Sequence, residues 1–431
     1  MFIFNELPGR LIRYMDGNSK INKMTKFNGL LIAISILFFL GCKKHSNSPG
    51  TPPVPIGEKF ITIGDSTSGS VLAMGVYRTQ DSKFIISGTK WLYDSTVGYL
   101  NYFPMRITVN SNLALVKSKA PLTYDYGGAI QSLEYNNYVY TAINVENTTT
   151  HLPAGVKVIK TDTLNNVLWS KVVTNLSQAT CFTLLSNGSF LMQGSAGTDN
   201  SMALLKLDTA GNATFRKDYT GQFLNSSFDV LEESNNYTLV AYQIVNHPHY
   251  FQTINASLLK IDFSGNIIST NLLDSFMSGS AHYYSSFHLR KNPMGGYILT
   301  TSSTAIVDPT VGGVIDEYFH LKMLNPDGST SNSIDLTVTG NHKIVFEIPD
   351  VLQTQNENIY VLVCCDTGSE WYTEVLKFDA KGNYQDYKDM LTGEYPVGLS
   401  EAENNNFIMI HDYSAGNSIT VLKMDPGLDI L

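Results

Sequence analysis

The side chains that could do chemistry do not fall into a catalytic or metal-binding pattern. His247 and His249 could offer two imidazoles to a metal ion, but no third ligand lies nearby in the chain. Ser66 could act as a nucleophile only beside a base, and no Asp-x-x-His pair comes after His288. No two carboxylates can be paired from sequence for glycoside hydrolysis. We therefore assign no catalytic residue and expect no metal and no cofactor.

Aromatic and imidazole side chains gather in segments of variable length, and these suit binding rather than catalysis. Exposed aromatic rings beside polar groups stack on sugars or anchor a protein partner. The alternative is that the rings only fill the space between long loops. The candidate partner-binding residues are Trp91, Tyr93, Tyr99, Tyr102, Tyr126, His247, His249, Tyr250, Tyr283, Trp371 and Tyr372.

A repeated unit positions these residues. Its most recognisable motif has the order apolar-apolar-Lys-apolar-Asp, followed after two residues by Gly-Asn. One copy is Leu204–Asp208 with Gly211-Asn212. The basic residue recurs about every 50 residues, the spacing of a supersecondary repeat. The seven copies are centred on Arg106, Lys160, Lys206, Lys260, Lys322, Lys377 and Lys423.

Each copy is preceded by a polar turn and an apolar or aromatic run, such as Asn187-Gly188 before Ser189–Ser195. Asn-Gly and Asp-x-x-Gly turns between short alternating runs are typical of antiparallel hairpins. In the third copy we expect strands at 179–185, 189–195, 202–208 and 213–219. Four such strands repeated at this period predict an all-β fold, a single seven-bladed β-propeller of four-stranded antiparallel blades.

The last unit ends too soon for a fourth strand, whereas Phe60–Ile63 has no unit of its own. We predict that this N-terminal strand completes the last blade and closes the ring, which removes both free edges. In such blades the first and third turns share one face. The second and fourth connections share the other, where the predicted loops 89–104, 144–155, 245–255, 303–318 and 366–373 carry most of the candidate residues.

The N-terminus predicts an exported, membrane-anchored protein. An apolar run at 30–40 follows Lys20, Lys23 and Lys26, and it is too short to span a bilayer as a helix. It ends in Phe39-Leu40-Gly41-Cys42, which resembles the lipobox of bacterial lipoproteins. That resemblance implies a lipidated Cys42. Lys43 in place of an aspartate implies the outer membrane, facing the periplasm or the cell surface.

The domain boundaries follow from these features. We expect an N-terminal extension at 1–23, which signal sequences do not need, and a signal peptide at 24–41. Lipidated Cys42 and a proline-rich tether occupy 42–57, and the propeller occupies 58–431. The lipobox and the repeat "GGYIL … LLKLDxxGN" together resemble uncharacterised β-propeller lipoproteins of Gram-negative bacteria. Those motifs are structural and imply no activity.

Composition limits the choice of partner. The chain has 431 residues, a net charge of -9 and 43% hydrophobic residues, so it is globular and lacks the basic field that attracts nucleic acid. Besides Cys42, the cysteines are Cys181, Cys364 and Cys365, which we expect to be packed thiols. The leading hypothesis is a membrane-anchored, non-catalytic module that binds a glycan or an envelope protein on the variable-loop face. The alternative is a polysaccharide hydrolase or lyase with carboxylates on that face.

Overall fold

The computed structural model of the protein describes residues 60–431 except 64–70, 95–98, 120–121, 124, 148–152, 174–175, 197–200, 224–228, 247–251, 278–282, 307–314, 337–343, 367–370, 393 and 414–417. The predicted extension, signal peptide, lipidation site at Cys42 and tether lie outside the described residues. Within the described part of the chain, no helix is long and apolar enough to cross a membrane.

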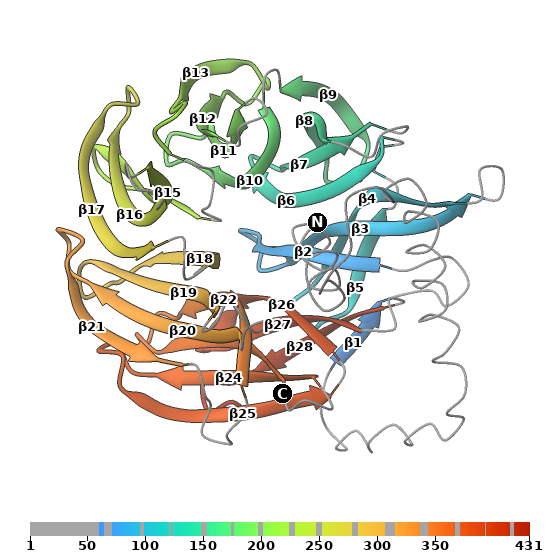
Figure 1. Ribbon diagram of the computed structural model, residues 1–431. Helices are drawn as coiled ribbons and strands as arrows, with labels where there is room; N and C mark the ends of the chain where they lie inside the picture. The colour runs from blue at the N-terminus through green and yellow to red at the C-terminus, as the bar shows by residue number, and fades with distance from the viewer. Residues whose placement is uncertain are drawn as a thin grey trace, which may run out of the picture. The chain divides into compact units, whose positions relative to one another are not determined.

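The described chain forms seven four-stranded antiparallel sheets, which follow one another in chain order (Figure 1). We number them as blades. Blade 1 is β2 (Val71–Arg78), β3 (Phe84–Asp94), β4 (Tyr99–Val109) and β5 (Leu115–Lys119); blade 2 is β6 (Gly127–Tyr135), β7 (Tyr138–Glu146), β8 (Pro153–Asp162) and β9 (Val167–Val173); blade 3 is β10 (Leu176–Leu184), β11 (Phe190–Ala196), β12 (Ser201–Leu207) and β13 (Ala213–Asp218).

The other four blades repeat this order. Blade 4 is β14 (Val230–Glu232), β15 (Asn236–Asn246), β16 (Gln252–Asp262) and β17 (Ile267–Met277); blade 5 is β18 (Tyr283–Lys291), β19 (Tyr297–Ile306), β20 (Ile315–Leu324) and β21 (Thr330–Asp335); blade 6 is β22 (Ile344–Gln353), β23 (Ile359–Asp366), β24 (Trp371–Phe378) and β25 (Tyr384–Thr392); blade 7 is β26 (Glu394–Glu401), β27 (Phe407–Tyr413), β28 (Ile419–Met424) and β1 (Phe60–Ile63). The prediction of a seven-bladed propeller with four-stranded antiparallel blades is confirmed.

Blade 7 is built from both ends of the described chain. Strand β1 pairs antiparallel with β28, with Phe60 opposite Leu422 and Ile63 opposite Ile419, so the sheet order is β1-β28-β27-β26. Blade 7 also packs on blade 1, where Ile408 and Val421 join a core with Phe84. That β1 is what holds the ring closed stays a prediction, which a truncation can test.

The blades bury both of their faces against their neighbours. Between blades 2 and 3, Tyr140 lies 4.4 Å from Phe190, and Phe182 stacks on the same ring at 5.3 Å between centroids. Every residue of β11 is buried, because this strand lies inside its sheet and the sheet is covered on both sides. That is why central strands such as β23, Ile359–Asp366, carry long apolar runs.

The repeated Asp-x-x-Gly turn has the expected chemistry. The Asp208 carboxylate accepts hydrogen bonds from the backbone N–H of Ala210 and of Asn212, at 2.9 and 2.8 Å. Gly211 has a φ of +77°, and a Cβ there would come within 2.7 Å of the Trp169 ring. Asp162, Asp262 and Asp379 begin turns with the same Asp-to-Asn bonds.

The turn that joins the third and fourth strands of a blade, called the third turn, also accepts a hydrogen bond from the preceding blade. In every one of the seven interfaces, a side chain of one blade donates a hydrogen bond to a backbone carbonyl in the third turn of the next. The pairs are Lys117 to Thr163, Tyr140 to Thr209, Tyr219 to Gly265, Lys260 to Pro326, Asn332 to Lys381, Tyr360 to Pro426 and Lys423 to Ser111. The repeat therefore encodes joints between blades as well as the strands themselves.

Candidate functional site

The face that carries the second connections differs in form from the prediction. A large part of each segment predicted as a long loop is paired strand: β3 continues to Asp94 and pairs with β4 as far as Tyr99. Likewise β15 pairs with β16 up to Asn246 and Gln252. Alternating aromatic and apolar residues favour strands, so the hairpins extend beyond the common blade length. We keep the name variable-loop face for this side, and call the side of the first and third turns the turn face.

The hairpin of β3 and β4 carries two of the predicted residues as a cross-strand pair. Trp91 lies directly opposite Tyr102, with ring centroids 5.0 Å apart and planes tilted by 41°. Both rings are half-buried. Cross-strand aromatic pairs stabilise a hairpin and hold each ring in a fixed orientation. The hairpin therefore presents a rigid aromatic surface.

A second aromatic pair lies on the other side of the same hairpin. Phe103, the neighbour of Tyr102 on β4, stacks on Tyr126 of blade 2 with centroids 5.4 Å apart and an interplanar angle of 28°. Beside it, Asp125 forms an ion pair with Lys157 and accepts a hydrogen bond from Thr123 at 2.5 Å. Burial opposes the charge of Asp125, but Lys157 and Thr123 hold its pKa below the usual value.

A buried acid lies across the ladder from this second pair. The Glu146 backbone N–H donates to the Tyr126 carbonyl at 3.0 Å, which places the end of β7 beside the start of β6. Glu146 is 4% exposed, and burial raises the pKa of its carboxyl to about 7. A perturbed carboxyl in this position indicates a functional site more often than an ordinary surface acid does. No motif or spacing in the sequence indicated this acid.

The remaining predicted residues are distributed over other blades. Tyr372 on β24 is half-buried and packs against the core between blades 5 and 6. Tyr93, Tyr99, Tyr283 and Trp371 lie on β3, β4, β18 and β24, with side chains outside the described part of the structure. His247, His249 and Tyr250 also lie outside the described residues. The structure thus brings Trp91 and Tyr102 together and places Tyr126 at the other side of their hairpin.

The structure also reveals a charged cluster near the axis of the propeller that the sequence did not predict. The innermost strands contact one another around the ring, among them β14, β18 and β22. Arg290 on β18 contacts the carboxylates of Asp350 on β22 and of Asp229, which directly precedes β14, and its Nε donates to the Val351 carbonyl at 3.0 Å. His288 Nδ1 lies 3.4 Å from Asp229.

The charged groups of this cluster stabilise one another. Burial disfavours the charge on Asp229, yet Arg290 and His288 lower its pKa to about 2. Burial also opposes the charge on Arg290, whose pKa is nevertheless raised above its usual value by the two carboxylates. Because Arg290 contacts blades 4 and 6 from blade 5, we interpret the cluster as a clamp between blades. Positions from three separate repeats form it, which no local spacing could indicate.

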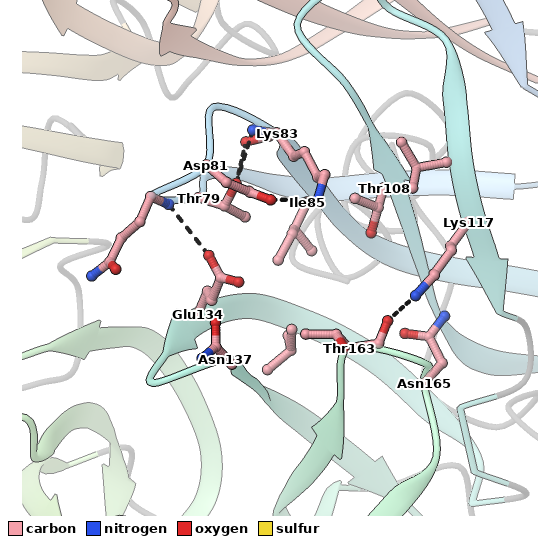
Figure 2. A pocket seen from close by; sticks show the side chains of 13 residues that line it. Thr79, Asp81, Lys83, Ile85, Thr108, Lys117, Glu134, Asn137, Thr163 and Asn165 are labelled. Atoms are coloured by element: carbon pink, nitrogen blue, oxygen red, sulfur yellow. Dashed lines mark hydrogen bonds and ion pairs between the residues drawn. The ribbon is translucent and has the colours of Figure 1, made fainter.

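A hollow of about 340 Å³ lies on the turn face between blades 1 and 2 (Figure 2). Its charged groups are already joined to each other or to backbone. Lys83 pairs with Asp81, and Glu134 accepts a hydrogen bond from the Gln80 backbone N–H at 3.3 Å. Lys117 donates to the Thr163 carbonyl. The hollow is therefore the seam between two blades, and it lies on the face opposite the predicted residues.

No metal-ligand set is found among the residues that the structure describes, where no group of three or more His, Cys, Asp or Glu could hold an ion. Cys181, Cys364 and Cys365 are buried, and none of these three described cysteines forms a disulfide. Burial raises the pKa of Cys181 to about 12, so this thiol is not poised to react.

No protein-family model and no curated protein matches the chain. Among solved structures it is similar to Drosophila Semaphorin 2a, with a TM-score of 0.49 and 9% identity over 85% of this chain and 76% of that one. It is also similar to an alpha-L-arabinanase of Penicillium chrysogenum complexed with arabinobiose, with a TM-score of 0.46 and 11% identity over 70% and 93%. A protein of unknown function from Bacteroides caccae has a TM-score of 0.41 and 11% identity over 75% and 94%. At such identities the likeness concerns the fold and not the ligand or reaction.

Proposed function

We propose that this protein is a non-catalytic recognition module that binds a glycan on the variable-loop face of blades 1 and 2. The observation that carries the proposal is the pair of aromatic contacts on the β3–β4 hairpin, Trp91 with Tyr102 and Phe103 with Tyr126. Rings held rigidly by their strands lose little conformational freedom when a sugar stacks on them. The nearby polar groups Asp125, Lys157 and Thr123 supply hydrogen-bonding partners for hydroxyl groups.

A glycan-array and polysaccharide pull-down screen with the full-length protein tests the proposal, with product analysis of every hit. We expect a glycan that is bound and released intact. Cleaved product would instead support the alternative of a hydrolase or lyase. A screen without glycan hits, together with capture of an envelope protein, would favour a protein partner on the same face.

Substitutions on the hairpin locate the site. Trp91→Ala and Tyr102→Ala are expected to weaken glycan binding at least about tenfold, as loss of a central aromatic contact does. Tyr384→Ala is the matched control, because this ring is 53% exposed on the outer strand β25 of blade 6. Unchanged affinity in both hairpin variants, with melting temperatures like that of the wild type, would contradict the assignment.

We further propose that the module is held on the outer membrane by lipid on Cys42. Two or more acyl chains give stable anchoring, each buried methylene contributing about 0.8 kcal/mol. Radiolabelled palmitate should enter the wild-type protein but not Cys42→Ala, which should appear in the soluble fraction. Equal labelling of both proteins would contradict the anchor. Protease accessibility on intact cells would separate surface display from a periplasm-facing position.

A further inference from the structure

Large apolar side chains are exposed along the outer edge of neighbouring blades 1 and 2. They belong to β5, to β9 and to the third turn before β9, and their exposed fractions range from 40% to 70%. Apolar groups gathered in this way on a surface indicate that it binds a partner or a membrane. We call this set the apolar rim: Leu115, Val116, Leu164, Val167, Leu168 and Val172.

The two halves of the apolar rim lie next to each other. Lys117 of β5 donates a hydrogen bond to the carbonyl of Thr163, whose chain neighbour is Leu164 (Figure 2). Val116 and Thr163 also line the same hollow between the two blades. The carboxylate of Asp162, which begins this turn, accepts hydrogen bonds from the turn's own backbone N–H groups. The apolar side chains of blades 1 and 2 therefore belong to one surface.

Charge distinguishes this part of the circumference from the rest. The outer strands of blades 7, 1 and 2 are β1, β5 and β9, and none of them contains Asp or Glu, although the chain has a net charge of -9. Their only charged residues are Lys117, Lys119 and Lys171. The outer strands of the other four blades all contain aspartate: Asp218, Asp274, Asp335, Asp386 and Asp389. Lysines beside the apolar rim attract anionic lipid headgroups.

The chain that leads to Cys42 starts from the same part of the circumference. β1 is the outer strand of blade 7, which packs on blade 1 (Figure 1). Residues 43–59 lie between Cys42 and Phe60, and a segment of that length reaches at most roughly 60 Å even when fully extended. A lipid on Cys42 would therefore keep the apolar rim within reach of the bilayer.

We propose that the apolar rim docks on a lipid bilayer that contains anionic headgroups, with its leucines and valines at headgroup level. The inference rests on the proposed lipid anchor and adds a second contact. An anchor on a tether leaves the propeller free to turn, whereas an apolar contact beside it fixes the edge that faces the membrane. Because the rim is part of the circumference of the ring, docking leaves the variable-loop face open to a glycan.

Fluorescence quenching by lipids that are brominated on their acyl chains tests the docking. The full-length, lipidated protein carries an environment-sensitive dye on Leu168→Cys, or on Ile268→Cys as the matched control, because Ile268 is 55% exposed on the outer strand of blade 4. Native cysteines do not interfere, since lipid blocks Cys42 and the three others are at most 4% exposed. The vesicles contain phosphatidylethanolamine and phosphatidylglycerol.

We expect brominated lipid to lower the emission at position 168 at least about twofold and to leave the emission at position 268 unchanged. The reason is that only a group buried roughly 5–10 Å into the boundary between headgroups and acyl chains meets the bromine atoms.

A second pair of variants separates docking from the nearness that the tether alone produces. Adding Leu164→Asp and Val172→Asp to the labelled Leu168→Cys protein should abolish the quenching, because carboxylates resist the loss of their hydration. These two side chains are 70% and 63% exposed, so the melting temperature should not change. Adding Ile267→Asp and Leu272→Asp on β17 is the matched control and should leave the quenching as it was.

Two results would overturn the inference while leaving the anchor in place. One is equal quenching at positions 168 and 268, and the other is quenching that survives Leu164→Asp with Val172→Asp in a folded protein. Protection of the dye that increases with protein concentration without vesicles, and without quenching by brominated lipid, would assign the rim to a second copy of this chain instead. If Cys42 incorporates no palmitate, the anchor fails, and the same quenching measured in Cys42→Ala decides for or against docking by itself.

Discussion

Arg290 on β18 donates from Nη2 to the Asp350 carboxylate on β22 at 2.7 Å, which joins the innermost strands of blades 5 and 6. Its Nη1 reaches Asp229 of blade 4 in the opposite direction. Asp350 in turn accepts a hydrogen bond from the Leu399 backbone N–H of blade 7 at 3.0 Å. A single guanidinium is thereby linked to three other blades.

Removing this guanidinium should weaken the ring substantially. Arg290→Ala leaves two carboxylates near each other without their counter-ion, a change that typically costs about 3 kcal/mol or more. We expect a corresponding decrease in the free energy of unfolding, measured by urea denaturation at pH 7. The control is Arg216→Ala, whose pair with Asp218 is on the exposed outer strand β13 and should contribute under about 1 kcal/mol. Equal losses in both variants would contradict the clamp.

Glu146 should make the protein less stable at high pH. Its pKa is about 7 in the folded protein and 4.5 ordinarily. Below pH 4.5 the acid is neutral in both the folded and the unfolded state, so it does not affect stability. Between pH 4.5 and 7 the unfolded chain ionises first, and the free energy of unfolding therefore falls. Above pH 7 both states are ionised, and this loss of stability is constant. Glu146→Gln should therefore gain about 2 kcal/mol over the wild type at pH 8 and nothing at pH 4. Thermal unfolding at the two pH values measures this difference, and a gain that does not depend on pH would refute the assignment.

The hydrogen bonds from tyrosines to third turns should contribute measurably to stability. Tyr219→Phe removes a bond from a buried hydroxyl to the Gly265 carbonyl at 3.0 Å, and we expect a loss of about 1 kcal/mol. Tyr140→Phe removes the corresponding bond to Thr209, which is longer at 3.4 Å, and should cost less. Chemical denaturation of both variants gives the comparison. A larger effect at Tyr140 than at Tyr219 would contradict the expected dependence on hydrogen-bond length.

Removing β1 tests ring closure. A chain that begins after Ile63 leaves one edge of β28 unpaired, because β1 is its neighbour on that side of the described sheet and β27 pairs only with the other side. We expect a lower melting temperature and concentration-dependent association, since an open edge strand pairs with other chains. A chain that begins at residue 58 is the control. Light scattering and calorimetry that fail to distinguish the two would show that β1 is dispensable for closure.

Most of the fold could be predicted because its signals are local and repeated. The strands expected in the third unit at 189–195 and 202–208 are found at Phe190–Ala196 and Ser201–Leu207. The residues of the turns determine where these strands end. After Ser201–Leu207, for example, the Asp208 carboxylate accepts hydrogen bonds from the backbone of the turn. The long hairpins were missed, because segments such as Trp91–Asp94 were interpreted as loops on account of their variable length, although their residue types favour strands.

The sites were less predictable because they depend on contacts between blades. Trp91 and Tyr102 were candidates by residue type, and their pairing follows from the register of one hairpin. Phe103 was not selected, although its neighbour was, since nothing in the sequence places it against Tyr126. Glu146 and Arg290 depend on burial and on partners 20 to 60 residues away. Such proximity is a property of the assembled ring.

The seven joints to the third turns share one property that affects how this sequence can change over time. Every acceptor is a main-chain oxygen, as in Thr209, Pro326 and Pro426, so the joint does not depend on which side chains the turn carries. The donors are already diverse, with lysine, tyrosine and asparagine at different interfaces. The repeats can therefore diverge in sequence while the hydrogen bonds between blades are kept. This accounts for a uniform architecture built from copies as different as those at Arg106 and Lys260.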